Sequence, residues 1–235
     1  MIVFTAENAM IRALSAQTMV RTGSSAFLIL DWFGSAGALG AVFVIEIYVC
    51  VDGRKDAMTR VVPAPRITMV RAQLGQQAVD ALVNGAPSIR KLAEGSNAFI
   101  WQWDRRQRKE LDALIRSNGV PVGEAVAGSG GKLPARWVVH TVYPADIGSN
   151  EALELLGSCY REAMTVAAGL GARSVGFAKM LWPDPEYAEG RRRAAWVAVS
   201  SAMNAPPPLT EIVFASPDPD VASVYADVYE SLSRS

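Results

Sequence analysis

The stretch NGVPVGEAVAGSGGKLPARWVVHTVYP, residues 118–144, decides the fold class of this chain. It opens with Asn118-Gly119, a pair typical of a left-handed helix cap, directly after an amphipathic run over Arg105–Ser117. It closes with an almost continuous apolar run over Trp137–Val142, which Pro144 stops. A strand without polar alternation is buried on both faces, and this is typical of a sheet that helices cover on both sides.

Short apolar runs and helical patterns alternate on both sides of this stretch. We expect further strands over Ile67–Arg71, Val79–Val83, Arg173–Ala178 and Glu211–Ala215. We expect further helices over Glu151–Ala168, Tyr187–Met203 and Val221–Leu232, the last of them capped by Asp218 or Asp220. The sequence therefore predicts an α/β fold, a three-layer α/β/α sandwich, with ligands beyond the carboxyl ends of the strands.

The composition excludes several classes of protein. Of 235 residues 50% are apolar, ample for a packed core, and 23 basic side chains balance 23 acidic ones. A net charge of zero excludes a strong field toward nucleic acid or an anionic membrane. With one histidine, His140, and two cysteines, Cys50 and Cys159, we expect no metal site and no disulfide scaffold. We expect a cytoplasmic setting and no cofactor.

Residues 1–57 do not connect to the alternating pattern. We expect them to form an extension outside a compact unit over residues 58–235. Two alternatives stay open for the extension. Either the β-branched run Val42–Val51 is a strand that Asp52-Gly53 ends, or the native chain begins at Met58.

A membrane anchor within this extension is not favoured. Ala26–Val51 is strongly apolar, but only fourteen uncharged residues lie between Asp31 and Glu46. A membrane helix needs about 20 consecutive apolar residues, and a carboxylate in the hydrocarbon core is costly.

Five segments, in the correct order, resemble the macro domain, the ADP-ribose-binding fold. The quoted stretch is similar to the family's motifs P-T-G-E-A and L-P-A-[KR]-x-V-I-H-T-V-G-P. Residues 67–86, ITMVRAQLGQQAVDALVNGA, resemble the opening of the family's domain, in which a strand is followed by a Gly-Asp-Ile-Thr turn and then by V-D-A-I-V-N-A-A-N. SCYREAM, ARSVGFA and EIVFASPD resemble later elements. The likeness covers about Arg66 to Leu232 and implies a mixed central sheet.

The resemblance also implies which positions would touch an ADP-ribosyl ligand. Gln73 stands where the family's Asp accepts the adenine amino group, and Asn84 matches the first Asn of Asn-Ala-Ala-Asn. Residues 179–183, KMLWP, take the place of the diphosphate loop. The implied binding residues are Gln73, Leu74, Asn84, Gly95, Ser96, Lys179 and Trp182, and Asn97 takes the place of the hydrolases' catalytic Asp.

Several of these positions depart from the family pattern. Gln73 has lost the charge of the Asp, Pro87 replaces the second Asn, and Asn97 is an amide that cannot act as a general base. KMLWP is short and has no glycine, although glycine favours the positive-φ turns that hold a diphosphate. Pro217 stands where an aromatic residue stacks on adenine.

Single residues of interest also have structural interpretations. We interpret His140 as a core histidine and Cys159 as a small buried apolar residue. Asn84 either binds ribose or caps the next turn. Trp101, Trp103 and Trp182 either form an aromatic floor for a base or fill the volume of a lost site. The basic runs 105–109 and 191–193 are interpreted as solvated helix faces.

Three functional hypotheses follow. The first is a macro domain that binds ADP-ribose, or an ADP-ribosylated protein, without efficient catalysis. The second is an ADP-ribosyl or O-acetyl-ADP-ribose hydrolase, and the third is a structural or protein-interaction module whose cleft Met180 and Trp182 fill. We expect no nucleic acid and no membrane as partner.

Overall fold

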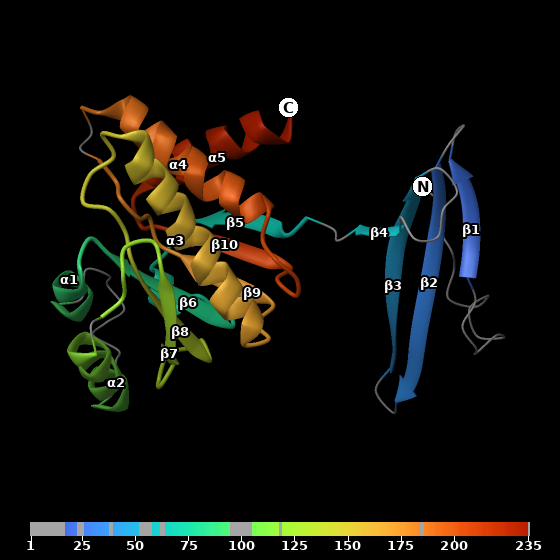
Figure 1. Ribbon diagram of the computed structural model, residues 1–235, viewed down its shortest axis with the longest axis horizontal. Coiled ribbons are helices and arrows are strands. Elements are labelled where there is room, and N and C mark those ends of the chain that lie inside the picture. Colours follow the sequence, from blue (N-terminus) through green and yellow to red (C-terminus); the bar gives the residue numbers. More distant parts are fainter. Residues whose placement is uncertain are drawn as a thin grey trace. The chain divides into compact units, whose positions relative to one another are not determined.

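A computed structural model of the chain describes residues 17–22, 26–37, 40–51, 58–61, 64–94, 105–117, 119–183 and 186–234 (Figure 1). The predicted segments 95–97 and 101–104 lie outside these residues. The chain divides into two compact units, Met1–Pro63 and Ala64–Ser235. No helix of the described part is long and apolar enough to cross a membrane.

The first unit contains an antiparallel four-stranded sheet in the order β1-β2-β3-β4. The apolar run Val42–Val51 belongs to its third strand. The strands are β1 (Gln17–Thr22), β2 (Ala26–Gly37), β3 (Gly40–Val51) and β4 (Met58–Val61).

The second unit is built on a six-stranded mixed sheet, as the resemblance implied. Its order is β5-β10-β9-β6-β8-β7, and every neighbouring pair is parallel except β7 with β8. The strands are β5 (Arg66–Val70), β6 (Ala81–Ala86), β7 (Ala125–Ser129), β8 (Trp137–Val142), β9 (Ser174–Phe177) and β10 (Glu211–Ala215).

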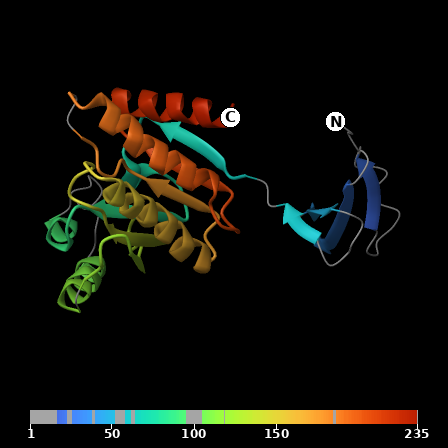
Figure 2. The same cartoon turned by 45° about the horizontal axis from the view of Figure 1, so that its top comes forward.

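Helices cover both faces of this sheet, so the predicted three-layer fold is confirmed. Helices α3 (Asn150–Gly169), α4 (Ala188–Met203) and α5 (Pro219–Ser233) lie side by side on one face (Figures 1 and 2). Helices α1 (Ile89–Glu94) and α2 (Arg105–Arg116) pack on the other. A 3-10 helix, η3 (Leu74–Gln76), follows β5.

The helix ends follow the signals in the sequence. Asp218 accepts a hydrogen bond from the Asp220 amide at 3.1 Å at the start of α5, which confirms the first of the two predicted caps. At the end of α2, Gly119 adopts a φ of 72° and its amide bonds to the Leu114 carbonyl at 3.0 Å. Gly171 has a φ of 77° beyond the end of α3.

The main difference from the predicted elements concerns β6. We expected a strand over Val79–Val83, but β6 runs over Ala81–Ala86 and all six residues are buried. Asn84 therefore lies within the strand rather than after it. Strand β7 and helix α1 were not predicted, because AVAGS is poor in large apolar residues and α1 has only six residues.

Asp80 joins the starts of three central strands. Its carboxylate accepts hydrogen bonds from the amides of Arg173 and Ser174 at 2.8 and 3.1 Å, at the start of β9. Its carbonyl accepts from the amides of Arg136 and Trp137 at 3.0 and 3.1 Å, at the start of β8. The hydrogen bond from the Arg173 amide is the main reason that the pKa of Asp80 lies below its ordinary 3.8.

Replacing this carboxylate should loosen the sheet. We expect Asp80→Ala to lower the free energy of unfolding by about 1.5–3 kcal/mol at pH 7, as for hydrogen bonds to a charged group. Because folding lowers the pKa, this stabilisation is complete above about pH 4 and is lost as the pH falls through the lowered pKa. Urea unfolding of both proteins across pH 2–7 measures the difference.

The exposed Asp227 on α5 supplies the matched control. Asp227→Ala should change stability little, as expected for a surface position. A constant difference between wild type and Asp80→Ala down to pH 2 would contradict the assigned role of the charge.

Candidate functional site

The carboxyl ends of five parallel strands meet at one edge of the sheet, where ligands bind in folds of this kind. The loops after β5, β10 and β9 are neighbours there, and β6 lies next to β9. Of the predicted site residues, the order of the strands gathers Gln73, Lys179 and Trp182 at this edge. Pro87 and Pro217 also follow strands here, and both are exposed.

Gln73 and Leu74 occupy different surroundings. Gln73 is exposed at the start of η3, and its carbonyl accepts a hydrogen bond from the Gln77 side chain at 3.0 Å. The Leu74 side chain is buried in the core between the sheet and the α1–α2 layer. Of these two residues, only Gln73 therefore has a side chain that a ligand at this edge could contact.

Asn84 bonds to the only histidine in the chain. Its side chain is fully buried on β6, and its amide nitrogen lies 3.2 Å from Nδ1 of His140 on the neighbouring β8. Since the amide nitrogen can only donate, Nδ1 accepts and the neutral ring keeps its proton on Nε2. The structure gives Asn84 a buried partner on β8, and its predicted roles in binding ribose or capping a turn stay predictions.

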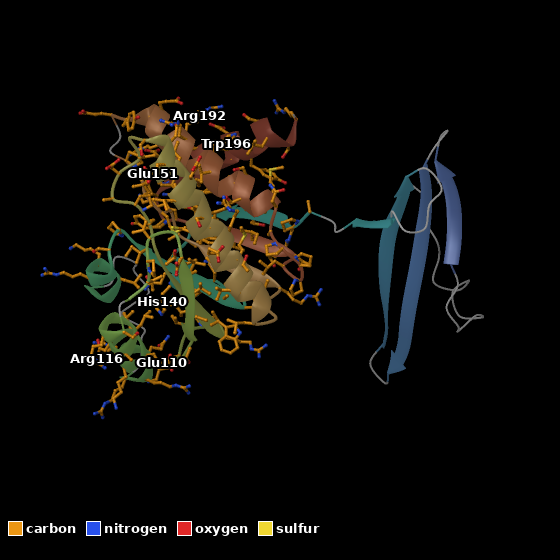
Figure 3. All side chains as sticks on the ribbon, viewed as in Figure 1. Glu110, Arg116, His140, Glu151, Arg192 and Trp196 are labelled. Carbon is orange, nitrogen blue, oxygen red and sulfur yellow. The ribbon has the colours of Figure 1, made fainter. Side chains whose placement is uncertain are left out.

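Burial keeps His140 neutral. It lowers the pKa of the ring from 6.5 to about 4, although the negative charge of Glu110 on α2 opposes the shift (Figure 3). The histidine is buried and hydrogen-bonded, in agreement with its interpretation as a core residue.

A cationic and aromatic cluster lies at the carboxyl end of β9. The Lys179 ammonium and the Arg191 guanidinium carbon lie 5.8 and 5.5 Å from the centroid of the Trp182 ring. Lys179 also pairs with Asp218 at 3.5 Å, and the Trp182 ring stacks on Tyr225 at 5.8 Å. Among the described residues the buried Nε1 of Trp182 has no hydrogen-bond acceptor.

Met180 lies against the middle of the carboxyl edge. Its side chain is 2% exposed, and a Cβ built on Gly85 would come within 2.5 Å of its sulfur atom. Tyr143 contacts the same place, 3.3 Å from that Cβ position. A side chain at position 85 would therefore force the Met180 side chain to shift.

Two tyrosines lie beside the main chain of the same loop, Tyr160 fully buried and Tyr143 half-buried. Burial raises the pKa of both phenols, and the nearby backbone of Met180 and of Leu181 opposes the rise. Leu181 has a φ of 48°, a left-handed conformation that is uncommon for a residue other than glycine. The loop therefore keeps a positive-φ turn without a glycine.

A small cavity lies next to Lys179, at the start of this loop. The cavity, between β5, β10 and α5, has a volume of about 10 Å³, room for roughly one water molecule. Lys179, Ser216 and Tyr225 are among its lining residues. In the described residues, no group of three or more side chains could hold a metal ion.

Gly95, Ser96 and Asn97 lie outside the described residues, as do Trp101 and Trp103. Their predicted roles remain predictions.

Comparison with known proteins identifies the family. A model of the Macro domain matches residues 94–181. A macro domain-containing protein of Streptomyces griseus is 40% identical over 48% of this chain and 67% of its own length. Another, from Streptomyces nogalater, is 35% identical over 63% of this chain and 83% of its own length.

Solved structures agree with this relationship. The Trypanosoma brucei macrodomain in complex with ADP-ribose is 26% identical, with a TM-score of 0.54 over 68% of each chain. An Oceanobacillus iheyensis macrodomain has the same fold, with a TM-score of 0.60 at 20% identity over 74% of this chain and 96% of its own. The chain belongs to the macro domain family.

Sequence reasoning missed Arg191 and Tyr143 as parts of the candidate site. Arg191 was grouped with its neighbours as part of a solvated face, but it lies on Trp182 and donates to the Pro183 carbonyl at 2.9 Å. Its place in the 191–193 run, one helical turn after the loop, was the only signal available. Tyr143 directly follows β8 at the ligand edge, a position that could have drawn attention to it.

Because His140 is the only histidine, its titration can be followed without ambiguity. We expect the NMR signal of its ring to show no protonation between pH 8 and pH 5.5 in the folded protein, since its pKa is about 4.

The unfolded chain binds this proton near pH 6.5, so stability should fall between about pH 6.5 and pH 4, by at most about 1.4 kcal/mol per pH unit. A folded-state midpoint near 6.5 would show that the ring is not buried as described.

Gly85 and Met180 should be energetically coupled. Gly85→Ala should destabilise the protein by about 1–3 kcal/mol, as for an overpacked core, because the new methyl group meets the Met180 sulfur. In a Met180→Ala background the same change should cost less. A double-mutant cycle of unfolding free energies measures the coupling, and strict additivity would argue against the contact.

Proposed function

We propose that this macro domain binds ADP-ribose or a related ADP-ribosyl nucleotide, free or attached to protein, at the carboxyl edge of its sheet, without efficient catalysis. Family membership and the ADP-ribose complex of the related trypanosome protein support this ligand class. The observation that carries the proposal is the pair of cations, Lys179 and Arg191, on the Trp182 ring. A cytoplasmic setting fits such a ligand and remains part of the proposal.

The cluster offers what a diphosphate needs. In macro domains of the usual pattern, glycine-rich turns present backbone N–H groups to the phosphates. Here two side-chain cations, Lys179 and Arg191, supply charge-assisted donors. Asp218 holds Lys179 in place until a stronger anion competes for it.

The proposal of weak or absent catalysis rests on the chemistry of two positions. Asn97 is an amide and cannot take a proton from water as a carboxylate does. Pro87, which follows β6, has no side-chain donor or acceptor to orient the distal ribose.

One observation favours a second candidate, a protein-interaction module with a closed cleft. Gly85 departs from the family's alanine, and Met180 departs from its diphosphate loop, and each departure accommodates the other. With Met180 packed on Gly85, a ligand would have to displace the Met180 side chain before it could enter.

Calorimetric titration of the full chain with ADP-ribose tests the proposal. We expect saturable binding in the micromolar range for wild type. Lys179→Met and Arg191→Met should each weaken it about 10–100-fold, the loss expected for one charge-assisted hydrogen bond. Met180→Ala should strengthen binding, because it removes the side chain that covers Gly85.

Lys132→Met and Arg192→Met are the matched controls, because both cations are exposed and have no contact with Trp182 in the described structure. They should bind ADP-ribose as wild type does. Absence of binding at millimolar ADP-ribose in both wild type and Met180→Ala would reject the proposal in favour of the interaction module. Release of ADP-ribose from a modified protein at enzymatic rates would reject the non-catalytic part alone.

A further inference from the structure

A groove lies on the outer surface of α3 and α4. It has a volume of about 400 Å³, and Gly157 and Val197 are among the residues that line it. A Cβ built on Gly157 would lie 3.5 Å from Val197 and 2.8 Å from the Arg161 guanidinium, so this glycine keeps the groove deep. Leu153 lines it from α3 and Trp196 from α4.

Trp196 is the unusual residue of this surface. Its side chain is 53% exposed, the highest value among the exposed large apolar residues of the described chain (Figure 3). An exposed indole beside an apolar-floored groove is typical of protein interfaces, where tryptophan is enriched.

The two helices that form the groove carry opposite net charges. Helix α3 has three acidic residues and one basic residue, and α4 has one acidic residue and three basic ones, so their net charges are −2 and +2. Of these residues, Glu154 and Arg161 line the groove from α3 and Arg193 lines it from α4. A face with one acidic and one basic wall is complementary to a copy of itself.

We propose that this face binds a second copy of the chain, related by a two-fold axis that runs along the groove. Such an axis places α3 of each copy against α4 of the other, acidic wall on basic wall, and identical patches satisfy each other. Each Trp196 then enters the groove of the opposite copy. Binding of ADP-ribose plays no part in this contact, so the two proposals stand or fall separately.

The available area sets the strength of the dimer. Helix α4 has 16 residues and so is about 24 Å long, and two packed helices present a face about 20 Å wide. Face-to-face contact would bury roughly 1,000 Å² in total, at the lower limit for a specific interface. We therefore expect a reversible dimer with a Kd of about 10–100 μM.

Analytical ultracentrifugation of the full chain from about 1 μM to 1 mM tests the proposal. Wild type should pass from monomer to dimer over this range, and added salt should weaken the dimer because the walls are charged. Trp196→Ala removes the inserted side chain and Gly157→Leu fills the groove, and each should raise the Kd at least tenfold. Val122→Ser, which alters an exposed apolar residue outside the groove, should dimerise as wild type does.

Mixing the two variants separates this geometry from any other dimer. The Trp196→Ala chain keeps an open groove and the Gly157→Leu chain keeps its tryptophan, so a heterodimer recovers one of the two contacts. The mixture should associate more tightly than either variant alone, at unchanged melting temperature. A wild-type monomer at 1 mM, a dimer insensitive to both variants, or a mixture no tighter than its components would overturn the proposal.

Discussion

The central strand β6 is buried along its whole length, between β8 and β9 and beneath helices on both faces. Two features near the candidate site follow from this constraint. A polar side chain within such a strand needs a buried partner, and His140 on β8 provides it for Asn84. A strand buried between two others must also be held in register with them. Asp80 holds this register because it accepts hydrogen bonds from backbone amides at the starts of β8 and β9.

The loop after β9 packs closely on the residues around it. Met180 lies against Gly85, and Tyr143 and Tyr160 lie beside the loop. Leu181 keeps a left-handed turn at the cost of roughly 1 kcal/mol that glycine would not require. The edge presents side-chain cations around Trp182, so in the proposed function an anion is recognised by side chains rather than by main-chain donors.

The architecture was largely predictable from sequence, and the site was predictable only in part. The first and last residues of β8 (Trp137–Val142) and β10 (Glu211–Ala215) were predicted correctly, since apolar runs bounded by proline or charged residues have well-defined ends. The start and end of β6 were misplaced by two and three residues, because buried Asn84 and Gly85 look like loop residues when the chain is taken alone. Arg191 could not be separated from its neighbours, since only the packing of α4 shows which arginine lies against Trp182.

The sequence by itself determined the alternation of strands and helices, the cap at Gly119 and the family, because these depend on local propensity and on ordered motifs. It left Asp218 and Asp220 open as caps of α5, and the structure shows that Asp218 is the cap. Tertiary structure alone decided that Asn84 serves His140, that Met180 lies over Gly85, and that α3 and α4 form an open groove beside Trp196. The physical reason is that a pattern along the chain reports which face of an element is apolar, whereas the partner across a strand pair or helix pair is set by packing between distant segments.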